Sequence, residues 1–164
     1  MIENIIHYFE QISSLHRALI LAGGITFFWL MEGAIPLFGF TYHKWKHASI
    51  NIFFTLTTII INFSFALFIV RTSDYVVANK FGLLQLVNMP LWVFMIVGLL
   101  LLDLVGAYSI HLIEHKIKWM WKFHVVHHAD THVDTTTANR HHPGESVFRA
   151  VFTIIGVIIC GAPM

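Results

Sequence analysis

The sequence predicts an all-α, polytopic membrane protein with about four transmembrane helices and a helical, histidine-rich cap. Three observations lead to this fold class. Hydrophobic residues occupy 57% of the 164 positions and charged residues only 12%, unlike an ordinary soluble domain. Apolar runs long enough to cross a bilayer recur along the chain. Eight of the twelve histidines fall between residues 111 and 142.

The rest of the composition narrows the classes of function. A formal net charge of +1 without a long basic run gives no indication of a nucleic-acid partner. The single cysteine, Cys160, excludes an intrachain disulfide framework and a thiolate zinc cluster, so any metal must be bound by nitrogen and oxygen. Residues 1–17 contain no basic residue before Arg17, unlike a secretory signal, and we expect them to form an interfacial lead-in.

We expect one membrane domain over residues 1–164. A helix needs about 20 apolar residues, at about 1.5 Å each, to cross a hydrocarbon core of about 30 Å. The expected spans are about 18–40, 50–70, 90–110 and 147–163. The segment from Arg71 to Met89 is too polar to span, and we expect an interfacial loop with an amphipathic turn. The third span begins at Pro90 and is expected to continue out of the membrane into His111.

The basic residues predict the orientation of these spans. If residues 41–49 and 109–149 face one side, that side holds seven basic residues: Lys44, Lys46, Lys116, Lys118, Lys122, Arg140 and Arg149. The opposite side holds three, which are Arg17, Arg71 and Lys80. The positive-inside rule then places the N-terminus outside and the histidine-rich region, residues 109–146, on the cytoplasmic side.

The spacing of the histidines predicts a metal site. His111 and His115 are four residues apart, so that on a helix they lie about 40° apart on adjacent turns. His124, His127 and His128 follow an i, i+3, i+4 pattern, which places all three on one face. A zinc site usually takes four ligands, so this many imidazoles indicates two ions. Imidazole alone is compatible with zinc, copper, nickel or iron and does not choose the metal.

Acidic and further histidine residues lie close to these ligands in the sequence. They are candidates for orienting imidazole rings or for supplying additional ligand atoms. The candidates within the histidine-rich region are Glu114, Asp130, His132, Asp134, His141 and Glu145. His132 extends the second histidine face by one turn only if the helix persists to that point.

Two acids within the spans are further candidates, because an ionisable group at bilayer depth is costly. Asp103 precedes His111 by eight residues and would lie about 80° from it around a regular helix, and Tyr108 would share the face of His111 and His115. We expect Asp103 to bond a histidine ring or to line a cavity that leads to the metals. A polar contact between helices is an equal alternative for Asp103 and Glu32.

The histidines outside the cluster have a plainer interpretation. They fall in polar or interfacial positions, where we expect solvated side chains: His7, His16, His43 and His47. Aromatic residues of the spans are candidates to line a lipid groove beneath the histidines, although plain packing is the better interpretation: Phe27, Phe28, Phe63, Phe65 and Phe94.

Three motifs resemble the fatty acid hydroxylase and sterol desaturase superfamily of membrane-bound histidine-box oxygenases. They are HLIEH beginning at His111, WKFHVVHH ending at His128, and TANRHHPGE ending at Glu145. Asp103 and Tyr108 also fit the pattern of an acid and a tyrosine before the first box. The resemblance extends from about residue 103 to residue 145.

The resemblance implies an integral membrane oxidoreductase with a non-haem diiron centre that uses O2 and an external electron donor. Members hydroxylate or desaturate lipids such as fatty acyl chains, sterols and carotenoids. The implied metal ligands are His111, His115, His124, His127 and His128, with His142 matching the histidine of an Arg-x-His-Pro segment. Members carry a third HxxHH box after another membrane segment, and the chain ends at Met164 before one. We therefore interpret it as an N-terminal fragment or a truncated product.

Partners and rival functions follow from the same residues. No haem, flavin or ferredoxin motif is present, so we expect a separate electron-transfer protein at the cytoplasmic face. Lys116, Lys118 and Lys122 are candidates for its docking patch. The alternative role of these lysines is a solvated interfacial anchor. The substrate is expected to be a membrane lipid. The first rival is a membrane zinc-binding or transport protein without redox catalysis. The second is a haem-binding electron carrier with histidine pairs as axial ligands.

Overall fold

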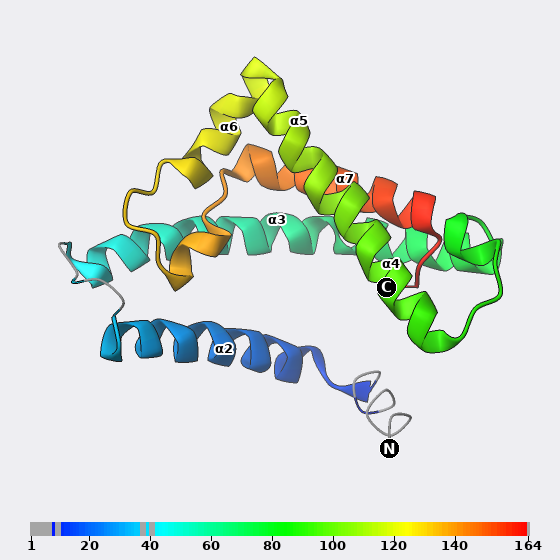
Figure 1. Cartoon of the computed structure of the whole chain (residues 1–164), viewed down its shortest axis with the longest axis horizontal. Helices are drawn as coiled ribbons and strands as arrows, with labels where there is room; N and C mark the ends of the chain where they lie inside the picture. The colour runs from blue at the N-terminus through cyan, green and yellow to red at the C-terminus, as the bar shows by residue number, and fades with distance from the viewer. Residues whose placement is uncertain (1–7, 9–10, 37–38, 40–41, 164) are drawn as a thin grey trace.

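The computed structural model describes residues 8, 11–36, 39 and 42–163, and all regular secondary structure in that part of the chain is helical (Figure 1). Most of the expected lead-in, residues 1–17, lies outside the described residues, and so does His7. Four long helices carry the fold, and a hairpin of two shorter helices rises from one end of them (Figure 1). The prediction of an all-helical chain is therefore confirmed.

The first described helix, α2 (Ser14–Ala34), is shorter than the expected span. It begins where the Ser13 hydroxyl accepts a hydrogen bond of 3.2 Å from the His16 amide. It ends at Ala34 because Ile35 precedes Pro36, and a residue before proline is driven out of the helical region; Ile35 has φ −129°. The expected residues 37, 38 and 40 of this span lie outside the described residues.

The second helix, α3 (Lys44–Ala78), is longer than the expected span 50–70 at both ends. Its 35 residues correspond to about 52 Å, which exceeds a hydrocarbon core of about 30 Å. The helix thus continues beyond the apolar stretch, and Arg71 and Asp74 are helical instead of opening the expected interfacial loop. The turn comes only after Ala78, where Lys80 adopts a φ of 51°.

The third helix continues without a break from the apolar span into the histidines, as predicted. It consists of α4 (Leu91–Asp103), a π-helical turn η2 (Leu104–Ser109) and α5 (Ile110–Lys116). Ile117 is extended, with φ −96° and ψ 111°, and reverses the chain into α6 (Lys118–His128). This hairpin of α5 and α6 places its histidines on facing helices.

The last helix, α7 (Pro143–Cys160), begins four residues before the expected start at residue 147. The His142 side chain accepts the Gly144 amide at 3.0 Å, and Pro143 occupies the first turn, where its missing amide proton costs little. The helix packs on α3 and on the π-turn. A Cβ on Gly156 would lie 3.5 Å from the Gly106 nitrogen, so two glycines allow the close approach of these helices.

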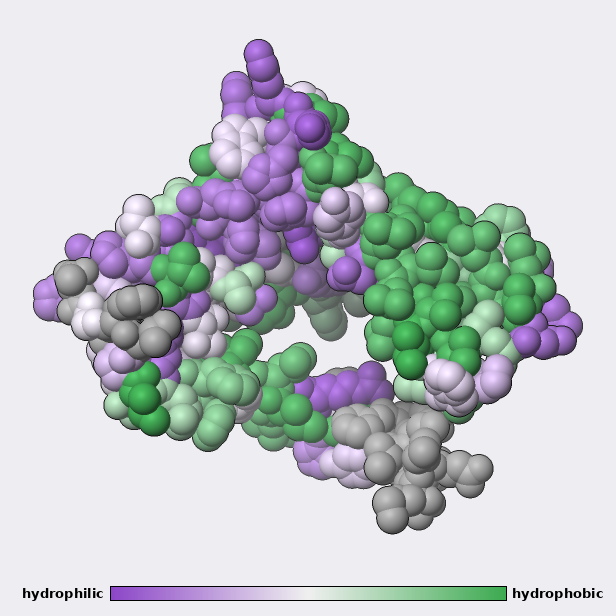
Figure 2. Space-filling model, in the orientation of Figure 1, coloured by the Kyte–Doolittle hydropathy of each residue, from purple (hydrophilic) through white to green (hydrophobic). Residues whose placement is uncertain are grey.

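Four helices are long and apolar enough to cross a membrane: Leu15–Ala34, Lys44–Gln85, Leu91–Lys116 and Pro143–Cys160. Their most apolar windows are mostly exposed, from none buried in the first two to 33% in the last. Hydrophobic surface covers α4, whereas hydrophilic surface gathers at the end that carries α5 and α6 (Figure 2). This exposed apolar surface is typical of helices that contact lipid.

Gly161 gives a test of the turn that closes α7. It has a φ of 68°, and a Cβ at this position would collide with the Phe81 carbonyl oxygen. We expect Gly161→Ala to lower the free energy of unfolding by about 1–3 kcal/mol. Gly23→Ala is the matched control, because a Cβ on Gly23 meets nothing within 4 Å. Thermal unfolding followed by circular dichroism in detergent measures both, and equal transitions for the two variants would contradict the described turn.

Candidate metal centre

Four histidines of the α5–α6 hairpin converge on one point. His111 and His115 come from α5, and His124 and His128 come from α6. One ring nitrogen of each lies within 4.8 Å of the corresponding nitrogen of every other. The Nε2 atoms are 3.2 Å apart in the His111–His115 pair and 3.0 Å apart in the His124–His128 pair.

These separations match adjacent ligands of a single ion. Two nitrogens that each bind an ion at about 2.1 Å lie about 3.0 Å apart at a right angle and about 3.4 Å apart in a tetrahedron. The indole of Trp121 covers one side of the cluster, stacked on His128 at 5.6 Å and tilted against His115 at 5.1 Å between ring centroids. The four histidines therefore form a candidate metal site with one aromatic wall.

His124 is the most constrained member, because it is fully buried between two buried carboxylates. Its Nδ1 lies 3.0 Å from Glu145 Oε1 on α7 and 3.3 Å from Glu114 Oε2 on α5. Donation of the Nδ1 proton to Glu145 leaves Nε2 as the free ligand atom, which is the arrangement by which carboxylates orient metal-binding histidines. Burial lowers the pKa of His124 to about 4, so the ring is neutral near neutral pH, as a ligand must be.

The two carboxylates also carry unused hydrogen-bonding capacity. Both oxygens of Glu114 and the Oε2 of Glu145 are buried without a hydrogen-bond partner among the described residues. Glu114, His124 and Glu145 together form a second group whose ligand atoms lie within 4.8 Å of one another. Buried anionic oxygens are costly unless positive charge compensates them. The donor set and these orphaned oxygens both fit a bound cation at the hairpin.

Two expected ligands lie outside the four-histidine cluster. The His127 ring stacks on His141, with centroids 4.9 Å apart and planes at 18°, and its Nδ1 is buried without a hydrogen bond within the described structure. Burial lowers the pKa of His127 as well. His142 caps α7 through Nδ1 and lies against the Phe123 ring at 5.0 Å. A capping role thus occupies one ring nitrogen of His142.

The other expected neighbours of the centre fall into three groups. Glu114, Glu145 and His141 are at the centre, since His141 Nδ1 lies 2.8 Å from Glu145 Oε1. Asp103 and Tyr108 are exposed, and no contact joins either of them to a histidine among the described residues. The π-turn contains Tyr108 and lies between Asp103 and His111; it holds one residue more than an α-helical turn, which rotates Asp103 by about 100° from its α-helical position relative to His111.

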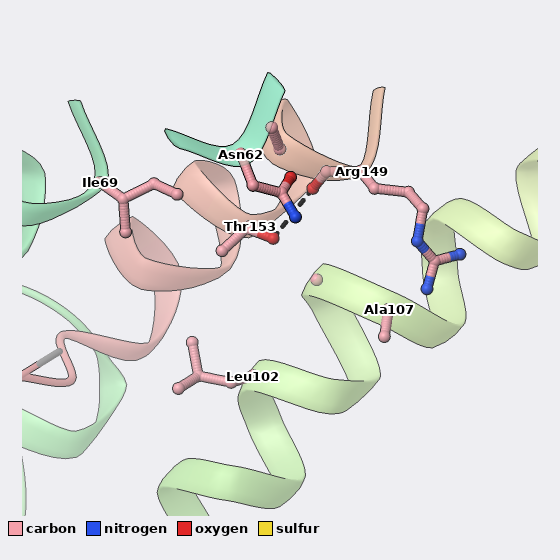
Figure 3. Close-up of a pocket in the computed structure, with 8 residues that line it drawn as sticks. Asn62, Ile69, Leu102, Ala107, Arg149 and Thr153 are labelled. Carbon is pink, nitrogen blue, oxygen red and sulfur yellow. Dashed lines mark hydrogen bonds between the residues drawn. The ribbon is translucent and has the colours of Figure 1, made fainter. Parts of the chain in front are cut away.

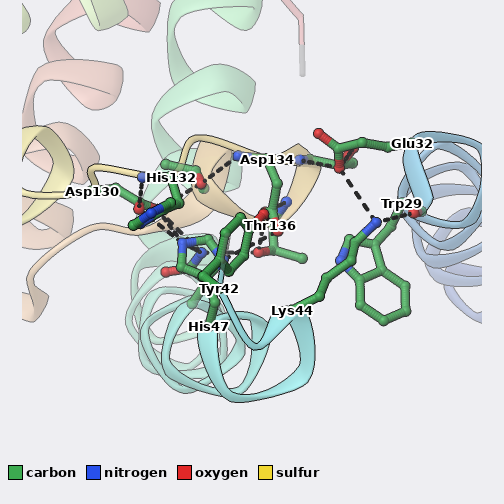
Figure 4. Close-up of polar contacts among 12 residues, drawn as sticks. Trp29, Glu32, Tyr42, Lys44, His47, Asp130, His132, Asp134 and Thr136 are labelled. Atoms are coloured by element: carbon green, nitrogen blue, oxygen red, sulfur yellow. Dashed lines mark hydrogen bonds and ion pairs between the residues drawn. The ribbon is translucent and has the colours of Figure 1, made fainter. Parts of the chain in front are cut away.

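Asp130 and His132 belong instead to a polar network at the same end of the molecule (Figure 4). The solvated role expected for His47 is wrong: its Nε2 lies 2.8 Å from both Asp130 oxygens and its Nδ1 lies 3.1 Å from Asp134 Oδ2. The Tyr42 ring contacts His132 with centroids 4.5 Å apart. These contacts join the start of α3 to the loop that follows α6.

Further hydrogen bonds stabilise this loop. Asn51 Nδ2 donates to Thr136 Oγ1 at 2.9 Å, and Thr137 Oγ1 donates to Asp130 Oδ2 at 2.7 Å. Burial by itself would raise the pKa of Asp130, but hydrogen bonds from Thr137 and His47 outweigh it and hold the pKa well below its usual range. The run of acids and threonines at 130–137 indicates a polar turn, but nothing in the sequence pairs it with His47, which is 83 residues away from Asp130.

The fold and the site together define a class of protein. Four helices of membrane-spanning type carry at one polar end a candidate metal site of histidines supported by buried carboxylates. Residues 95–164 match the family model described as fatty acid hydroxylase, which confirms the resemblance seen in the histidine motifs. This match covers the third helix from residue 95, the histidine hairpin and α7. No curated protein and no solved structure matches the chain.

Glu145 gives a test of the centre. Glu145→Ala removes the acceptor that orients His124, and we expect the affinity for a divalent metal to fall about 10- to 100-fold. Asp74→Asn is the control, since it removes an exposed carboxylate on α3. Competition against a chelating dye, with the purified chain in detergent, measures the affinity. An unchanged affinity in Glu145→Ala would show that the carboxylate does not support the site.

The polar network gives a second test. His47→Ala leaves the buried Asp130 and Asp134 without their shared partner, and we expect the free energy of unfolding to fall by about 2–3 kcal/mol. His43→Ala removes the same side chain from an exposed position four residues earlier and should be close to neutral. Thermal unfolding of the two variants compares them directly. Equal stability would mean that the network contributes nothing.

Proposed function

We propose that the chain is a membrane-bound oxidoreductase that uses histidine-bound, non-haem iron and O2 to hydroxylate or desaturate an unactivated C–H bond of a lipid. The observation that carries this proposal is the convergence of four histidines, supported by Glu145, at the polar end of apolar helices. The match of residues 95–164 to the fatty acid hydroxylase family supports it independently. A fatty acyl chain, a sterol or a related lipid would be the substrate.

The histidines and Glu145 would have separate roles in holding the metal. His111, His115, His124 and His128 would hold one iron, with Glu145 keeping the His124 proton on Nδ1. We infer that a second iron would use His127, whose buried Nδ1 lacks a partner among the described residues, together with further ligands. Bound iron would activate O2, the oxidant that attack on an alkyl C–H bond requires, while the surrounding side chains would position the lipid and exclude water.

Hydroxylation of R–H by O2 gives R–OH and water and consumes two electrons and two protons. A separate electron-transfer protein would supply the electrons, because the sequence contains no motif for a second redox group. A cavity of about 310 Å³ opens beside the centre and is lined by His115, Lys116, Lys118 and Trp121. With the exposed Lys122 it forms a basic surface next to a candidate ligand, which favours an acidic donor at this face.

The polar end of the molecule would face the cytoplasm. His47 and Asp130 bring the connector before α3 and the loop after α6 to the same end of the helices. This contact supports the assignment of seven basic residues to one side and three to the other, on which the orientation is based.

Zinc binding is the second candidate, because four imidazoles also equal the ligand number of a closed zinc site. A haem carrier is less compatible with the geometry. A haem iron takes two axial histidines, whereas four histidines converge here.

Metal analysis with an optical spectrum tests the proposal. We expect two irons per chain and no Soret band in protein purified from iron-supplemented cells. His115→Ala should lose at least half of the iron, whereas His43→Ala, which changes an exposed histidine outside the cluster, should retain it. Zinc alone in the purified protein would favour the second candidate, and a Soret band would overturn both.

A further inference from the structure

A cavity lies within the membrane-spanning part, below the histidine centre. It has a volume of about 400 Å³, is partly open, and is lined by residues of α3, of the third helix around the π-turn, and of α7 (Figure 3). Its apolar wall includes Ile69 and Leu102, and its polar wall includes Asn62, Arg149 and Thr153. A cavity of this size accommodates part of a lipid molecule.

Small residues keep this space open. Gly106, Ala107 and Ala150 are part of the lining. The backbones of the π-turn and α7 approach closely here, since a Cβ on Gly106 would lie 3.5 Å from the Thr153 Cα. The helices are thus in contact beside the cavity, and the absence of larger side chains leaves the room inside it.

Arg149 is an unusual residue to find in this lining. It is the seventh residue of α7, about 9 Å along the helix from Pro143, and its side chain is only 30% exposed. Its Nη1 is 3.8 Å from Glu145 Oε1, beyond hydrogen-bond distance, and that oxygen already accepts from His124 and His141. The guanidinium makes no hydrogen bond to any described residue, although it carries five N–H donors. An arginine at this depth with free donors indicates a functional role.

Asn62 adds a second set of donors to the lining, from α3. It lies near the middle of α3, and its side-chain amide also has no hydrogen bond within the described part of the chain. Thr153 differs, because its hydroxyl donates to the Arg149 carbonyl oxygen at 2.9 Å. Unpaired amide and guanidinium donors that line one cavity favour a ligand that supplies acceptor oxygens.

We propose that this cavity binds the anionic oxygen group of a lipid, with Arg149 as its charged partner and Asn62 as a second hydrogen-bond donor. The group is a carboxylate or a phosphate, whose oxygens match the planar donor geometry of a guanidinium. The proposal rests on the proposed function in one respect, namely that the ligand is the lipid presented to the histidine centre. Arg149 would connect the two sites, since Glu145 lies between it and His124.

Direct lipid binding to the full chain in detergent tests this proposal. Radiolabelled oleate, measured by scintillation proximity, should bind and should be displaced by unlabelled oleate but not by oleyl alcohol, which lacks the charge. Displacement by lysophosphatidic acid that is stronger than by oleate would identify phosphate as the preferred group. Arg149→Gln should weaken oleate binding at least 10-fold. Arg71→Gln, which removes an exposed arginine from the far end of α3, should not.

Two further variants keep the test independent of Glu145 and of folding. Asn62→Leu should weaken binding several-fold without touching the histidine centre, and Ala107→Leu should weaken it by filling the cavity. Equal binding of oleate and oleyl alcohol, or unchanged binding in Arg149→Gln, would show that Arg149 only extends towards the membrane surface and would overturn the proposal. Iron content is measured in the same samples. Loss of lipid binding with iron retained, or the reverse, separates failure of this inference from failure of the proposed function.

Discussion

The buried hydrogen bond between His124 Nδ1 and Glu145 Oε1 is the contact on which the histidine centre depends. It connects α6, which carries half of the four-histidine cluster, to α7, a membrane-spanning helix. Glu114 contacts the same imidazole from α5, so three helices meet at one side chain. Because both carboxylates and the ring are fully buried, removing any one of them would leave polar atoms without compensation.

Polar contacts contribute more to selecting one arrangement of the helices here than they do in a soluble helical bundle. Few apolar side chains are buried in the described structure, since the apolar faces of the four long helices are mostly exposed. Hydrophobic burial therefore distinguishes poorly between alternative arrangements of these helices. The network around His47 and Asp130 and the contacts around His124 each join segments that are distant in sequence. They determine which ends of the helices meet, and close glycine contacts such as Gly106 with Gly156 determine how near the helices approach.

Local spacing predicted the helices and the two histidine pairs at i and i+4, because an α-helix fixes the relation between such positions. Local spacing did not predict breaks in helical register or contacts between residues that are distant in the sequence. The expected relation between Asp103 and His111 fails because a π-turn changes the helical register between them. No residue type in that turn predicts a π-helix. His47 is 83 residues from Asp130, so their pairing is a property of the fold alone. The lengths of α2 and α3 differ from expectation because Pro36 and the turn after Ala78 end these helices, whereas apolar composition does not.

The start of α7 connects the histidine centre to the cavity through neighbouring side chains. Glu145 and Arg149 are four residues apart on α7 and so lie on the same side of the helix. His141 precedes the helix and reaches Glu145 Oε1 with its Nδ1 at 2.8 Å. His141 contacts the His127 ring, Glu145 holds His124, and Arg149 lines the cavity. The His142 cap and Pro143 determine where α7 begins. The His142 side chain accepts the Gly144 amide in the turn of α7 that carries Glu145. The cap therefore stabilises the turn from which Glu145 reaches His124, although His142 itself lies outside the four-histidine cluster.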